Sequence, residues 1–159
     1  MKSTLIVLLA LSISLFSCQS ATEHQQEGHS GHGKGNEPKT PADSLYVQVM
    51  EIHDQVMPKM GKIRGAQKQA QQFLDSLSGL PARQSVASAT YKQRLETLIS
   101  DLNYADFAMD KWMVEFNLDS AKDNQALRIA YLRSELDKVS NVKKAILGSL
   151  SKADSLLKK

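Results

Sequence analysis

Apolar residues recur every three or four positions along three long stretches of the chain, 45–77, 91–116 and 127–156. This spacing places the apolar side chains of each stretch on one face of an α-helix. No alternation with a period of two extends beyond a few residues, so the pattern argues against β-strands. The sequence therefore predicts an all-α fold built from three long helices.

Breaks in the pattern set the expected ends of these helices. Gly79-Leu80-Pro81 separates the first helix from the second. Ser120-Ala121-Lys122-Asp123 resembles a capping box at the start of the third helix. Because three helices with short connections must fold back on one another, we expect an elongated antiparallel three-helix bundle or coiled coil over residues 41–159. The helices are expected over about 41–78, 83–117 and 120–157.

The first helix carries two local signals. At its start, Thr40 is a suitable N-cap, Pro41 suits the first helical position and Asp43 favours the first turn. In its middle, Pro58 lacks the N–H that would bond to the carbonyl of Asp54. We therefore expect a kink close to Pro58.

A short apolar run near the beginning of the chain ends in Leu15-Phe16-Ser17-Cys18. Lys2 precedes the run, which is too short to span a bilayer because spanning takes about 20 apolar residues. The last four residues resemble the lipobox of bacterial lipoproteins, whose cysteine is lipidated after the signal peptide is removed. The resemblance implies a signal peptide over 1–17 and an acyl anchor, such as palmitate, on Cys18. The alternative is an ordinary secretory signal with an incidental cysteine.

The lipobox also implies a location. Lipoproteins without Asp after the cysteine usually continue to the outer membrane, and Gln19 follows Cys18 here. We expect a protein anchored to the outer membrane and facing the periplasm, with display on the cell surface as the alternative. The chain has 20 Lys and Arg against 17 Asp and Glu, with no basic stripe, so nucleic acid is not an expected partner.

Residues 18–40 contain no Val, Ile, Leu, Phe, Trp or Tyr. Such a segment cannot bury enough apolar surface to offset the entropy of ordering, so we expect a disordered, flexible tether. The tether holds a short histidine-rich tract formed by His24, His29 and His32. Imidazoles on a flexible chain would hold Cu(II) or Zn(II) loosely. The alternative is a polar spacer.

Methionines of the helical region fall in two short windows, one of which also contains a histidine. The members of the first window share one helix face, and those of the second are one turn apart. Thioether and imidazole ligands together suit Cu(I). The candidate copper ligands are His53, Met57, Met109, Met113, Met50 and Met60.

The two windows meet only if the first two helices pair in the right register. A hairpin that turns near Leu80 would place His53 across from Ala108. The alternative is a structural cluster, because methionine fills irregular gaps in helical cores and packs well against a ring such as that of Trp112. In that case His53 is a partly exposed residue paired with Asp110.

The segment Ile52-His53-Asp54-Gln55-Val56-Met57 resembles part of a family of small helical lipoproteins from Gram-negative bacteria, some of them labelled "viral A-type inclusion protein". The lipobox and the pair Trp112-Met113 are shared features. The similarity extends loosely over most of residues 42–118. Since the family has no assigned activity, the resemblance implies a helical architecture and an envelope location.

The sequence contains none of the common catalytic motifs, such as a Gly-rich phosphate loop, a Gly-x-Ser-x-Gly elbow or His-Glu-x-x-His. His53 and Asp54 are neighbours that point to different sides of a helix, which disfavours a catalytic relay. We expect a lipid-anchored, non-enzymatic protein that binds or scaffolds an envelope partner. A copper-binding protein is the alternative, and self-association through heptad faces is a third reading.

Overall fold

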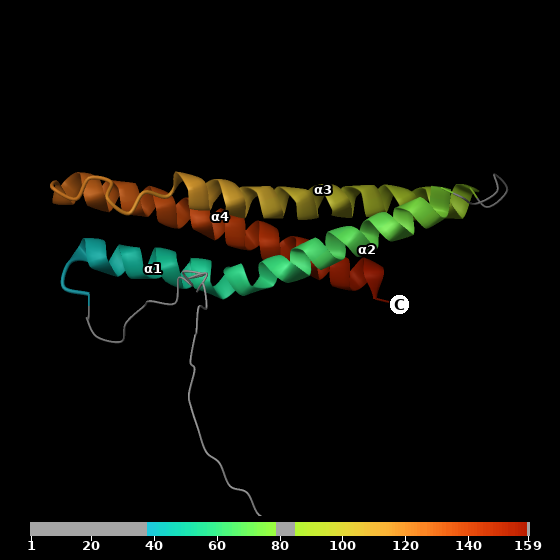
Figure 1. Ribbon diagram of the computed structural model, residues 1–159, viewed down its shortest axis with the longest axis horizontal. Helices are drawn as coiled ribbons and strands as arrows, with labels where there is room; N and C mark the ends of the chain where they lie inside the picture. The colour runs from blue at the N-terminus through green and yellow to red at the C-terminus, as the bar shows by residue number, and fades with distance from the viewer. Residues whose placement is uncertain (1–37, 79–84, 159) are drawn as a thin grey trace, which may run out of the picture. The chain divides into compact units, whose positions relative to one another are not determined.

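The computed structural model describes residues 38–78 and 85–158. Within these ranges there are helices and turns but no strand, which confirms the all-α prediction. The helices, drawn in Figure 1, are α1 (Pro41–Val56), the 3₁₀ turn η1 (Met57–Lys59), α2 (Met60–Ser78), α3 (Ser85–Glu115) and α4 (Gln125–Leu157). None of the helices in the described part of the chain is long and apolar enough to cross a membrane.

The helices pack as three rods that alternate in direction. The first rod consists of α1, η1 and α2, the second is α3 and the third is α4 (Figure 1). Helix α4 contacts α1, α2 and α3, and α2 also contacts α3. The expected antiparallel three-helix bundle is therefore confirmed, with α4 as the helix that the others share.

The first rod is interrupted at Pro58, as expected. Helix α1 ends at Val56, and the next residues form the 3₁₀ turn, in which the N–H of Met60 donates to the carbonyl of Met57. Before the interruption the rod packs mainly on α4, and after it the rod packs on both α3 and α4. The proline thus marks the place where the rod changes its packing partner.

The start of α1 confirms the capping prediction. Thr40 Oγ1 accepts a hydrogen bond from the backbone N–H of Asp43 at 3.1 Å, and Asp43 Oδ2 accepts one from the N–H of Thr40 at 3.0 Å. These two bonds form a reciprocal capping box, and Pro41 occupies the first helical position.

The expected start of the third helix is wrong. Helix α4 begins at Gln125, and its N-cap is Asn124, whose Oδ1 accepts from the N–H of Leu127 at 3.1 Å. Ala121 adopts a left-handed conformation with φ of 55°, which cannot continue a right-handed helix. The segment that resembled a capping box, 120–123, therefore forms turns, and the connection is longer than expected.

The core follows the three apolar stripes, and its buried centre contains no histidine. Its fully buried members come from every α-helix: Val49, Val56, Ile63, Ala70, Leu95, Leu102, Ala105, Met109, Leu132, Val139 and Ile146. Burial of this kind contributes about 25 cal/mol for each Å² of apolar surface removed from water. The buried faces are those that the periodicity predicts, except at Leu127, which is 60% exposed.

The register between α2 and α3 differs from the expected one. Arg64 Nε donates to Asp106 Oδ1 at 3.1 Å, and Gln67 Nε2 donates to Asn103 Oδ1 at 3.1 Å. A turn centred near Leu80 would instead have placed Arg64 across from position 97. Periodicity determines which face of a helix is buried, but it carries no information on the height at which two helices meet.

Candidate functional site

Helix α3 carries apolar side chains on two opposite faces. One face enters the core, and the other is directed away from it. We call this second face the outer stripe; it consists of Tyr104, Phe107, Lys111, Val114 and, just past the helix, Leu118. Tyr104 and Phe107 are each 62% exposed and Val114 is 86% exposed. An exposed apolar stripe of this kind is a candidate interaction surface.

The positions of the outer stripe are separated by three, four, three and four residues. This is the a/d spacing of a coiled-coil seam, in which each side chain fits between four residues of a facing helix. The core stripe alone accounts for the amphipathic pattern of α3, so the sequence did not reveal the outer stripe. The signal that could have revealed it is the repetition of the same 3–4 spacing half a turn away.

The candidate copper ligands divide into buried and accessible residues. Met60 and Met109 belong to the hydrophobic core. Met57 and Met113 are 38% and 37% exposed, and Met50 is half-buried. Met60 and Met109 pack as expected if the methionines are structural, because they lie among the apolar side chains of the core.

His53 lies beside Trp112, with ring centroids 5.6 Å apart at 37°. Its contact is thus one turn beyond the expected Ala108. The expected pairing with Asp110 is wrong, since His53 Nδ1 lies 2.9 Å from Asp54 Oδ1. The two neighbours do reach each other, contrary to our expectation from their helix positions.

The observed register applies to α2 and α3 only. It is defined by the pairs of Arg64 with Asp106 and of Gln67 with Asn103, which lie after the 3₁₀ turn that contains Met57. Among the described residues, no group of three or more His, Cys, Asp and Glu side chains is arranged to hold a metal ion. Thioether sulfurs form a separate class of ligand that suits Cu(I).

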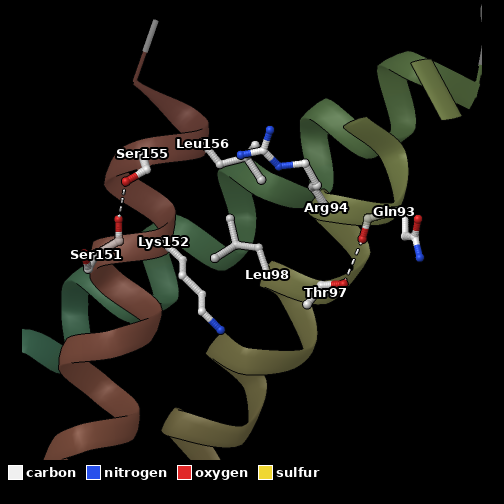
Figure 2. Close-up of a pocket in the computed structure, with 8 residues that line it drawn as sticks. All are labelled: Gln93, Arg94, Thr97, Leu98, Ser151, Lys152, Ser155 and Leu156. Carbon is white, nitrogen blue, oxygen red and sulfur yellow. Dashed lines mark hydrogen bonds between the residues drawn. The ribbon is translucent and has the colours of Figure 1, made fainter. Parts of the chain in front are cut away.

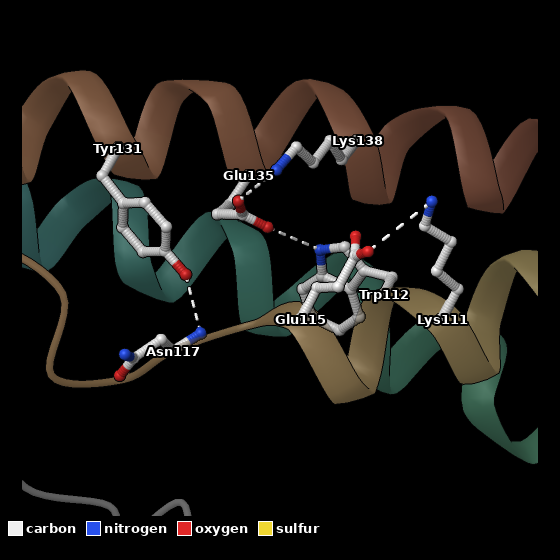
Figure 3. Close-up of polar contacts among 7 residues, drawn as sticks. All are labelled: Lys111, Trp112, Glu115, Asn117, Tyr131, Glu135 and Lys138. Carbon is white, nitrogen blue, oxygen red and sulfur yellow. Dashed lines mark hydrogen bonds and ion pairs between the residues drawn. The ribbon is translucent and has the colours of Figure 1, made fainter.

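A buried polar network, which the sequence did not indicate, joins α3 to α4 (Figure 3). Glu135 is only 1% exposed. Its Oε2 accepts from Trp112 Nε1 at 3.0 Å, and its Oε1 accepts from Lys138 Nζ at 2.8 Å. The hydrogen bond to Glu135 raises the pKa of the Lys138 amine above its usual 10.5. Both carboxylate oxygens are therefore satisfied, as a buried charge requires.

Stacked rings continue from this network toward the α3–α4 connection. The ring of Trp112 stacks on Phe116 at 4.9 Å, and Phe116 lies 6.3 Å from Tyr131. The hydroxyl of Tyr131 accepts from the backbone N–H of Asn117 at 2.7 Å (Figure 3). The rings thus link the end of α3 to the first two turns of α4.

A shallow pocket of about 370 Å³ lies between α3 and α4. Figure 2 shows its lining, which comprises Gln93, Arg94, Thr97, Leu98, Ser151, Lys152, Ser155 and Leu156. Several of its polar groups already have partners. Lys152 Nζ donates to Asp101 at 2.7 Å, and the hydroxyls of Thr97 and Ser155 donate to backbone carbonyls of their own helices at 2.9 Å. The pocket therefore has few polar groups left to orient a ligand.

No protein-family model, curated protein or solved structure matches this chain. The resemblance to a lipoprotein family thus stays an expectation from the sequence. The predicted anchor Cys18 and the tether histidines His24, His29 and His32 lie outside the described residues.

Proposed function

We propose that this chain is a lipid-anchored, non-enzymatic helical protein of the cell envelope that binds a protein partner along the outer stripe. The observation that carries the proposal is the exposure of Tyr104, Phe107 and Val114 on the face of α3 opposite to the core. Full burial of a large apolar side chain contributes about 1.5–3 kcal/mol. A partner that covered these three side chains would gain part of this contribution, reduced by the entropy lost on association.

The spacing and the charges of the stripe favour a protein helix over a lipid surface. Coiled-coil spacing matches the grooves of another helix. A membrane-binding face would be rich in Lys and Arg, whereas this face has Lys111 alone, which lies 3.5 Å from Glu115. Asp110 flanks the stripe on its other side and would repel an anionic surface.

The anchor would hold the bundle close to the membrane. A coil with the length of residues 18–40 reaches roughly 25 Å. A bundle on such a tether would explore a thin layer beside the membrane, where a scaffold meets other envelope proteins. If the anchor is right, Cys18→Ser will move the protein from the membrane fraction of Gram-negative cells to the soluble fraction. Unchanged fractionation would contradict lipidation.

Photo-crosslinking in cells tests the binding face directly. The full-length chain is produced in a Gram-negative host with p-benzoylphenylalanine at position 107, and a matched control carries the same residue at Lys144, an exposed position on α4. We expect an ultraviolet-dependent protein adduct from position 107 and none from position 144. Equal adducts from both positions, or none from either, would refute a specific binding face on α3.

Copper binding is a second candidate function, favoured by the grouping of accessible soft ligands. His53 is one turn from Met57 on the first rod, and the side chains of both Met57 and Met113 on α3 are partly exposed. The buried Met60 and Met109 are excluded as first-choice ligands by their place in the core. The ligand set of this proposal is therefore His53, Met57 and Met113.

The copper proposal is tested by titrating the detergent-solubilised protein with Cu(I) against a competing chelator. A variant with His53→Ala and Met57→Leu should lose competition for Cu(I), whereas Met60→Leu should retain it, because Met-to-Leu changes in a core are usually tolerated. An affinity that is the same in both variants and in the wild type would exclude this site.

A further inference from the structure

We infer that the occupant of the outer stripe is a second copy of this chain, with the two α3 helices antiparallel. The inference rests on the proposed function and names its partner. The four helical positions of the stripe are symmetric about position 109: Tyr104 and Phe107 lie on one side of this point, and Lys111 and Val114 lie at matching separations on the other. Leu118, past the end of α3, has no counterpart. A two-fold axis through position 109 places Tyr104 against Val114 and Phe107 against Lys111 of the second copy.

The lysine in the stripe selects this orientation. In a parallel pair, Lys111 would face its own copy inside an apolar seam, and the two like charges would repel. In the antiparallel pair, Lys111 faces the ring of Phe107, which attracts a cation. Its aliphatic stem also covers apolar surface while the amine reaches the edge of the seam.

The charge of Lys111 is already balanced within its own helix. Its Nζ lies 3.5 Å from Glu115 Oε1, one turn away. Asp110, on the flank of the stripe, lies 3.8 Å from Arg64 of α2. The charges around the seam are therefore compensated inside each copy, and pairing does not bring an unbalanced charge into the interface.

The size of the stripe indicates a weak dimer. Covering Tyr104, Phe107 and Val114 would remove roughly 350 Å² of apolar surface from each copy, given the areas that such side chains bury. Stable dimers usually bury about 800 Å² on each partner. Anchors in one membrane would raise the local concentration and favour a pairing that is weak in free solution.

The register is tested by mapping crosslinks from the full-length protein in cells. Two differently tagged copies are co-produced, with p-benzoylphenylalanine at position 104 or at position 114, and the adducts are digested and sequenced by mass spectrometry. We expect probe 104 to label the other copy near Val114, and probe 114 to label it near Tyr104. Labelling of position 104 by probe 104 would show a parallel pair and overturn the inference.

Other outcomes separate this inference from the proposed function. Adducts only with a different protein would overturn the inference that the partner is a second copy, but they would support the binding face on α3. Adducts only with lipid, or none at all, would overturn both proposals.

A charge exchange gives an independent measurement. Phe107→Lys would face Lys111 of the other copy, and we expect the yield of the crosslink from position 104 to fall about tenfold. Adding Lys111→Glu should restore the yield, because unlike charges then face each other. Leu147→Lys, an equivalent change at an exposed position on α4, serves as the matched control and should leave the yield unchanged. A double variant that crosslinks no better than Phe107→Lys would overturn the register.

Discussion

At the scale of single residues, Glu135 is the side chain whose environment is least ordinary. Acidic residues are seldom fully buried unless they are paired, and this one is 1% exposed. Its two oxygens accept from Trp112 and Lys138, one from each of the helices that the network joins. An indole N–H in a core needs such an acceptor, which explains why an apolar residue does not occupy position 135.

Replacing this acceptor should destabilise the fold. In Glu135→Leu the Trp112 N–H is left buried without a partner, and we expect the free energy of unfolding to fall by about 1–3 kcal/mol. Urea denaturation followed by circular dichroism measures the change, and Ser134→Leu, at the exposed neighbouring position, serves as the control. A Glu135→Leu protein as stable as the control would show that the hydrogen bond is unimportant.

The same network predicts a loss of stability at alkaline pH. The hydrogen bond to Glu135 raises the pKa of Lys138 in the folded protein above the usual 10.5. Stability from this group is thus fully present below that usual value and is lost as the pH rises through the folded-state pKa. The amine is half-exposed, so the effect is small.

The measurement is the melting temperature from about pH 9 to about pH 12. In the wild type it should fall more steeply with pH than in Lys138→Gln, which has no titrating amine at this position. Parallel curves for the two proteins would contradict the linkage between Lys138 and Glu135.

At the scale of the helices, periodicity and capping residues were sufficient for most of the fold. The three apolar stripes became the buried faces, Thr40 caps α1, and Pro58 interrupts the first rod. These features are local, because each depends on residues a few positions apart.

The features that the sequence did not predict correctly depend on tertiary structure. The height at which α2 meets α3 follows from packing, and the sequence pattern misplaced it relative to the observed pair of Arg64 and Asp106. As a consequence, the sequence pattern grouped the methionines together, but it could not distinguish the core residue Met109 from the partly exposed Met57 and Met113. The outer stripe was missed because exposure cannot be read from spacing alone.

The connection between α3 and α4 offers a test at this scale. Ala121 is held at a φ of 55°, a left-handed conformation that disfavours any residue with a Cβ atom. Ala121→Gly should therefore raise the free energy of unfolding by about 1 kcal/mol. Ala126→Gly, in the first turn of α4, should lower it, since glycine weakens a helix. Chemical denaturation of both variants gives the comparison, and destabilisation by Ala121→Gly would contradict the strained turn.

At the scale of the whole bundle, α3 has one buried apolar face and one exposed apolar face. Its inner face supplies Leu102, Met109 and Trp112 to the core, while Tyr104 and Phe107 on its other side remain in contact with water. Such a helix can bind a partner through residues that the fold itself does not need. Substitutions in the outer stripe should therefore change association and leave the helical content intact.

Helix α4 has the opposite character, because every other helix of the described chain depends on it. It contacts α1, α2 and α3, and α1 packs mainly against it. It also follows the other described helices in the sequence, so it is synthesised after them. Until residues 125–157 have been synthesised, α1 has almost no surface to pack on, whereas α2 and α3 can already pack on each other. The pair of α2 and α3 can therefore form first, and α1 joins it only once α4 is present.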